Sequence, residues 1–299
     1  MTSINTFSIK INNILFTINI FLLNYVNKNV DMMKDKIIRL LYFLSNYITN
    51  DALKTVEINI IQLDLKKQLP MNNKVLDSYN VNTGVTWACK PRGEIVIYRK
   101  EEWFKVLIHE TMHALCLDFS GFTYTNLKKK ISNIFPINSK FEISETYAET
   151  WATILNNVFI SNEMANNDKD RFKFFNSLMK LDIYFSLFQV VKLLDFMNIY
   201  EYEYLYCKEK ECMIFQKLYK ENTNVFAYYV LKMVCIYNYV SFINFCKSNN
   251  TDIINFNKNG SRGENSLILH NFLNLLKKCY KDNKLLKSYE HMKKMYKIE

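Results

Sequence analysis

The stretch EIVIYRKEEWFKVLIHETMHALCL, residues 94–117, places a strand pattern almost directly before a helix pattern. β-Branched residues dominate its first part, which is typical of a strand, whereas the later apolar residues recur at the spacing of a buried helix. Within that predicted helix His109 and His113 are four residues apart and therefore share one face. Glu110 lies about 100° around the helix from His109, where it can contact a water on a metal ion rather than the ion itself. The stretch predicts a strand-to-helix junction carrying two ligands of a zinc site.

The residues before this junction predict a small sheet. Residues 31–55 have apolar positions at helical spacing, and residues 57–65 have the β-branched, partly alternating pattern of a strand. Residues 80–100 predict two more strands, joined by the turn Pro91–Gly93.

The residues after the junction predict helices. Residues 144–160 form one, residues 171–247 are helical and strongly apolar, and a last helix follows the polar break at residues 251–266. This order predicts an α+β, mostly helical fold with a small antiparallel or mixed sheet before the histidine helix. We expect residues 1–160 to hold the N-terminal helices, the sheet and the zinc-site helices, and residues 161–299 to form a helical C-terminal lobe packed on the same unit.

Composition excludes some partners. The net charge of +10 invites a nucleic-acid function, but the basic residues are scattered and their runs are short, so no nucleic acid is expected. The apolar run ILFTINIFLL, residues 14–23, is too short and too polar for a membrane span and has no small-residue cleavage site nearby. We expect it to be a buried element, without stable membrane insertion.

The seven cysteines contain no C-x-x-C pair, and the closest two, Cys207 and Cys212, are five residues apart. This pattern favours reduced, partly buried thiols over a disulfide framework. It predicts a cytoplasmic, reducing location.

A catalytic zinc site uses three protein ligands and keeps one position for water. Glu145 and Glu149 are four residues apart on the helix predicted at residues 144–160, so both lie on one face. One of them can bind the metal while the other accepts the free N–H of a ligand histidine.

HETMH followed on a later helix by SETYAETWA resembles the gluzincins, a family of zinc peptidases. The resemblance implies that His109, His113 and Glu145 bind Zn²⁺, that Glu149 orients the first histidine, and that Glu110 is the general base. The gap between His113 and Glu145 is longer than in the best-known gluzincins, which leaves open which of the two glutamates contacts the metal.

The resemblance also assigns an edge strand to substrate binding. The strand before the HExxH helix offers its open edge to an extended peptide in such enzymes, and residues 80–87 occupy a similar position here. We expect Gly84, Val85 and Thr86 to contact substrate, with Gly84 permitting close backbone approach.

The predicted function is a zinc-dependent peptidase in which Glu110 takes a proton from a metal-activated water. Its partner would be a peptide or protein substrate. Tyr228, Tyr229 and His270 are candidates for the donor that stabilises the oxyanion, and Arg262 is a candidate for binding a substrate carboxylate. The alternative is a non-catalytic structural or interaction protein that keeps a metallopeptidase fold.

Overall fold

The computed structural model describes residues 2–23, 30–48, 52–71, 75–254, 256, 261–263 and 265–297. The chain forms two compact units. The first comprises Met1–Gln68, Asn82–Gly121 and Asn250–Asn259, and the second comprises Leu69–Val81, Phe122–Asn249 and Gly260–Glu299. The division expected at residue 160 stays a prediction.

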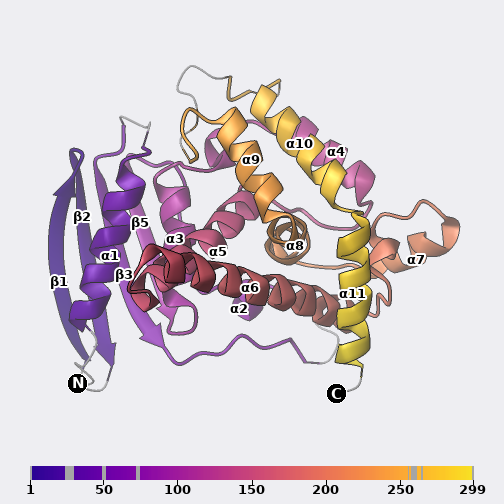
Figure 1. Ribbon diagram of the computed structural model, residues 1–299, viewed down its shortest axis with the longest axis horizontal. Coiled ribbons are helices and arrows are strands. Elements are labelled where there is room, and N and C mark those ends of the chain that lie inside the picture. Colours follow the sequence, from indigo (N-terminus) through magenta and orange to yellow (C-terminus); the bar gives the residue numbers. More distant parts are fainter. Residues whose placement is uncertain are drawn as a thin grey trace. The chain divides into compact units, whose positions relative to one another are not determined.

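The first unit contains a mixed five-stranded sheet (Figure 1). Its strands lie in the order β1-β2-β3-β5-β4, so that β1 and β4 are the edges. The outer pairs β1–β2 and β4–β5 are antiparallel, whereas β3 is parallel to both of its neighbours. The bounds are β1 Thr2–Ile11, β2 Ile14–Leu23, β3 Thr55–Leu63, β4 Gly84–Thr86 and β5 Arg92–Arg99.

The apolar run at residues 14–23 is the strand β2, paired with β1 through a tight turn. Asn12 and Asn13 form that turn with φ angles of 47° and 66°, the left-handed conformation that two-residue hairpin turns require. Alternate residues of β2 are fully buried, and Asn19 on the other face donates to Asn59 at 2.9 Å. Among the described residues no single helix is long and apolar enough to cross a membrane, although the bent pair Phe226–Tyr237 and Tyr239–Asn249 passes that test jointly.

Helix α3, Trp103–Ala114, follows β5 after three residues and packs against β4 and β5. Leu107, Ile108 and Met112 are fully buried, which explains why this segment is helical and where its apolar face lies. Gly84 allows the edge strand β4 to lie close to β5, because a Cβ at this position would lie 2.8 Å from Ile97 Cδ1. The close approach at Gly84 is therefore needed for packing within the unit.

Helices make up most of the second unit, and α1, Val30–Ser45, belongs to the first. The helix predicted over residues 31–55 thus ends at Ser45. In the second unit α5 packs against α6 and α8, and α10 packs against α4 and α9. The helices are α2 Ser78–Val81, α4 Thr125–Ile134, α5 Ile143–Met164, α6 Asp168–Phe196, α7 Lys210–Leu218, the π-helical η4 Phe226–Leu231, α8 Lys232–Tyr237, α9 Tyr239–Asn249, α10 Leu267–Cys279 and α11 Asn283–Tyr296. The α+β, mostly helical class is confirmed.

Two disulfides correct the predicted location. Cys89 is bonded to Cys116 and Cys207 to Cys212, while the other three cysteines are buried free thiols. Disulfides persist in oxidising compartments, so the expectation of reduced thiols in the cytoplasm is wrong. An oxidising compartment, such as the secretory pathway or the cell exterior, fits the structure instead.

Candidate metal centre

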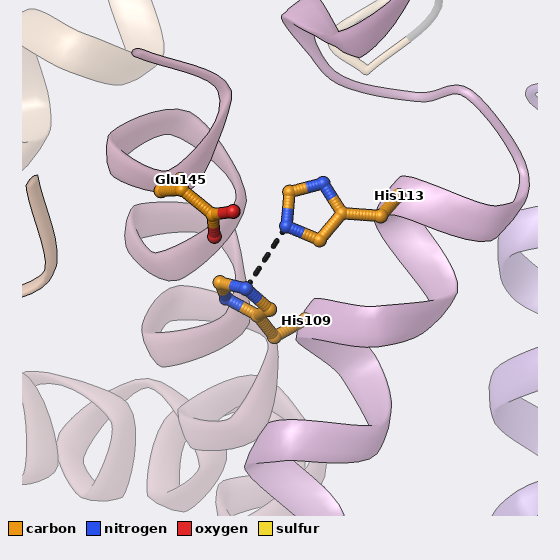
Figure 2. A group of neighbouring side chains, drawn as sticks. All are labelled: His109, His113 and Glu145. Atoms are coloured by element: carbon orange, nitrogen blue, oxygen red, sulfur yellow. Dashed lines mark hydrogen bonds between the residues drawn. The ribbon is translucent and has the colours of Figure 1, made fainter. Parts of the chain in front are cut away.

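Helix α3 brings His109 and His113 together at one turn's separation (Figure 2). Their Nε2 atoms lie 3.0 Å apart, and both side chains are almost completely buried. Two nitrogens that share a tetrahedral zinc at about 2.0–2.1 Å would lie roughly 3.3 Å apart. The pair is therefore close to the separation that one zinc ion requires.

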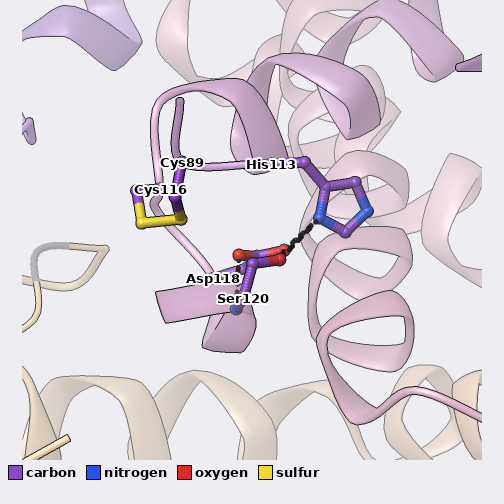
Figure 3. Close-up of a disulfide and its surroundings, with 5 residues drawn as sticks. All are labelled: Cys89, His113, Cys116, Asp118 and Ser120. Carbon is purple, nitrogen blue, oxygen red and sulfur yellow. Dashed lines mark hydrogen bonds and ion pairs between the residues drawn. A yellow bond between two sulfur atoms is a disulfide. The ribbon is translucent and has the colours of Figure 1, made fainter. Parts of the chain in front are cut away.

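A buried carboxylate fixes the orientation of His113 (Figure 3). Asp118 is fully buried and pairs through Oδ2 with His113 Nδ1, and Ser120 Oγ lies 3.3 Å from the same nitrogen. Ser120 in turn donates to Asp118 through its backbone N–H at 2.9 Å and through its hydroxyl at 3.1 Å. Because the carboxylate accepts a hydrogen bond from Nδ1–H, the Nε2 lone pair of His113 is left for a metal.

The end of α3 explains how Asp118 reaches His113. The N–H of Leu117 donates to the Met112 carbonyl at 2.8 Å and that of Cys116 to the His113 carbonyl at 3.0 Å, as in a Schellman turn. Cys116 takes the left-handed position with φ 59°, which glycine usually occupies. The chain thereby reverses under the last turn of the helix and returns Asp118 to the histidine.

The Cys89–Cys116 disulfide joins this turn to the segment between β4 and β5 (Figure 3). The Cys89 N–H also donates to the His113 carbonyl at 3.2 Å. A covalent bond and a backbone hydrogen bond thus hold the C-terminal end of the histidine helix.

Asp118 and Ser120 are functional candidates that the sequence prediction missed. The only signal was an acidic residue five positions after His113, beyond the predicted helix. Glu149, which was expected to orient a histidine, lies half-buried on α5, where its carbonyl accepts from Thr153 at 3.0 Å. Its predicted role stays a prediction.

Glu145 lies in the first turn of α5 and is half-buried. The side-chain amide of Asn224 donates to its Oε1 at 3.5 Å, and the Asn224 side-chain oxygen Oδ1 accepts from the Glu142 N–H at 3.0 Å. Single ligand atoms of His109, His113 and Glu145 lie within 4.8 Å of one another (Figure 2). The three side chains form a group that could hold a metal ion, as the HExxH motif and the downstream glutamate predicted.

The segment after Asn224 carries both tyrosine candidates. Tyr228 and Tyr229 are half-buried on the π-helix η4, a form often found at functional sites. Glu221 holds the beginning of η4 by accepting the Phe226 N–H at 2.8 Å, and it also accepts from the Ser139 hydroxyl. Burial raises the pKa of Glu221 to about 7. Their role as oxyanion donors stays a prediction.

The other predicted residues fall on defined elements. Glu110 is on α3 and only 7% exposed, while Gly84, Val85 and Thr86 form the edge strand β4. Arg262 lies over the ring of Phe122, 5.7 Å from its centroid, in the loop before α10. Its contact with a substrate carboxylate stays a prediction.

Asp118→Asn is expected to weaken zinc binding about 10- to 100-fold, because the amide keeps the shape but loses the charge that orients and polarises His113. A competition titration against a chromophoric chelator measures the affinity. Ser120→Ala is the matched comparison, since it removes only the hydroxyl contact and should weaken binding less. Equal zinc affinity in the wild-type and Asp118→Asn chains would contradict this role for Asp118.

A scan against protein-family models and a search of curated proteins find no match to this chain. The functional assignment therefore rests on the residues of the candidate metal centre.

Proposed function

We propose that this protein is a zinc-dependent peptidase. The convergence of one ligand atom each from His109, His113 and Glu145 within 4.8 Å is the observation that supports it most strongly. Glu110 adjoins His109 on the same helix, in the arrangement that hydrolytic zinc sites of the HExxH type use.

The donor set fits zinc. Two imidazole nitrogens and one carboxylate oxygen are a common set for catalytic zinc, which keeps a fourth position for water. His113 is prepared for this role, since Asp118 holds the proton of the imidazole on Nδ1. Burial of both histidines also keeps bulk water from competing for the ligands. Bound zinc would lower the pKa of its water to about 7 and polarise the substrate carbonyl.

Glu110 would move the proton in this reaction. Its carboxylate accepts the proton of the attacking water and then delivers it to the nitrogen of the leaving amine. The side chain is almost completely buried, which keeps its position on α3 fixed by packing rather than by solvent.

The edge strand β4 supports a peptide as the substrate. Tyr98 N–H donates to the Thr83 carbonyl, and Val85 pairs with Val96 two residues further along. In an antiparallel ladder the residues that alternate with the hydrogen-bonded ones turn their backbone N–H and C=O groups away from the partner strand. Gly84 and Thr86, which alternate with Thr83 and Val85, therefore present these groups to the open edge. An extended peptide would add to this edge by backbone hydrogen bonds.

Metal content tests the ligand set. The purified wild-type chain should contain about one zinc ion, and His109→Ala, His113→Ala and Glu145→Ala should each lose it, because two remaining ligands hold zinc poorly. Inductively coupled plasma mass spectrometry of the dialysed proteins gives the ratio. His291→Ala, at an exposed position on α11, is the control and should retain the metal.

The Glu149→Ala variant distinguishes which of the two glutamates, Glu145 or Glu149, binds the metal. It should keep more zinc than Glu145→Ala, and the opposite order would exchange their roles. Full zinc content in a chain that lacks both the His109 and the His113 side chains would show that these residues do not form the zinc site.

A further inference from the structure

A pocket of about 260 Å³ is lined by residues of α4, of α10 and of the two positions before α10. These two helices pack together within the second unit (Figure 1). The pocket is distinct from the candidate metal centre, with which it shares no residue. Its lining consists of Asn126, Leu127, Lys130, Asn265, Ser266, Leu267, Leu269, His270 and Leu273.

The beginning of α10 supplies hydrogen-bond donors to this pocket. The first N–H groups of a helix have no acceptor within the helix, and they carry a partial positive charge. In α10 the His270 N–H is the one that reaches the Ser266 carbonyl, which leaves the N–H groups of residues 267–269 outside the helical ladder. Such a helix end is suited to bind an anion.

Ser266 is an independent sign of a ligand. It occupies the N-cap position, where a serine side chain normally accepts from the first turn, but its hydroxyl makes no capping hydrogen bond. The residue is only 2% exposed and lines the pocket, and its hydroxyl takes part in no side-chain hydrogen bond among the described residues. A hydrogen-bond acceptor in the pocket would give this hydroxyl the partner that it lacks within the described part of the chain.

The charges at the pocket favour an anion. Lys130 is exposed at its rim and forms no ion pair within the described part of the chain, whereas its neighbour on the same helix, Lys128, pairs with Glu142 at 2.7 Å. No acidic side chain is among the described residues that line it, and the His270 imidazole adds a nitrogen that can donate a hydrogen bond. Leu127 and Leu273 give the remaining wall an apolar surface.

We propose that this pocket binds a small organic anion, with a phosphate or carboxylate group on the N-terminus of α10, the Ser266 hydroxyl and Lys130. The apolar part of the ligand packs on Leu127 and Leu273. The volume accommodates a molecule larger than the oxyanion alone but smaller than most drug-sized ligands.

Isothermal titration of the full chain with sodium phosphate and, separately, sodium acetate at constant ionic strength tests the site and distinguishes the two oxyanions. Saturable binding of at least one is expected, in the millimolar range for such bare ions. Lys130→Gln and Ser266→Ala should each weaken it roughly tenfold, the size of one hydrogen bond to a charged group. Lys129→Gln, an exposed lysine that does not line the pocket, should leave the affinity unchanged.

Three results would overturn the proposal. The first is no saturable binding of either ion. The second is an affinity that Lys130→Gln and Ser266→Ala lower no more than Lys129→Gln does, which indicates non-specific attraction to a basic protein. The third is binding that survives Lys130→Gln and disappears in His113→Ala, which assigns the anion to the metal centre.

Discussion

Glu110→Gln is expected to leave the zinc content of the protein unchanged and to lower peptide cleavage about 10²- to 10⁴-fold, the usual contribution of a general base. Glutamine has the size and shape of glutamate, so the buried position on α3 remains filled. Its amide does not accept the proton of the attacking water. The metal is retained because the three proposed ligands are untouched.

An unbiased peptide library incubated with the zinc-loaded chain and read by mass spectrometry supplies the substrate for this measurement. Glu101→Gln is the matched control, since it makes the same chemical change at an exposed position just before α3. A zinc chelator should abolish cleavage by the wild-type chain. Unchanged turnover in Glu110→Gln would remove Glu110 as the base, and a zinc-loaded wild-type chain that cleaves no peptide would favour the non-catalytic alternative.

The two histidines of the metal centre were predictable because their spacing within one helix is a pattern of neighbouring residues in the sequence. Four-residue spacing places His109 and His113 on one helical face wherever that helix packs, and the β-branched run before it is typical of a strand. The contribution of Asp118 depends on a chain reversal instead. That reversal uses a cysteine in the left-handed position, so the glycine that normally marks such a helix end is absent.

The N-terminal hairpin was missed for a different reason. In β2 the buried residues alternate, but several residues on the other face are also apolar, so the run has no clean period. The informative signal was the pair Asn12–Asn13, which tolerates the positive φ angles of a two-residue turn. Recognising that pair would have predicted two strands and a larger sheet.

The disulfides were missed because sequence spacing alone does not show which cysteines meet. Cys89 and Cys116 are 27 residues apart and are brought together by the packing of α3 against β4 and β5. An odd number of cysteines also argued against pairing, yet the three left over are buried in the helical unit.

Removing each disulfide separately should have unequal effects on stability. Cys89→Ser/Cys116→Ser opens a loop of 27 residues and should lower the free energy of unfolding by about 3.5 kcal/mol, whereas Cys207→Ser/Cys212→Ser opens a loop of five and should lower it by about 2 kcal/mol. The difference arises because a longer cross-linked loop restricts the unfolded chain more. Urea unfolding followed by circular dichroism, with all variants purified under the same oxidising conditions, measures both values.

Zinc affinity distinguishes the two disulfides further. Cys116 lies two residues before Asp118, and the Cys89 N–H donates to the His113 carbonyl, so loss of this bond loosens the turn that orients His113. We expect Cys89→Ser/Cys116→Ser to weaken zinc binding roughly tenfold, the lower end of what a lost orienting contact costs, and Cys207→Ser/Cys212→Ser to leave it unchanged. Wild-type zinc affinity in both variants, despite their lowered stabilities, would show that the Cys89–Cys116 bond stabilises the fold without positioning Asp118. A loss of affinity in Cys207→Ser/Cys212→Ser as well, in proportion to its lost stability, would instead indicate that zinc binding follows global stability.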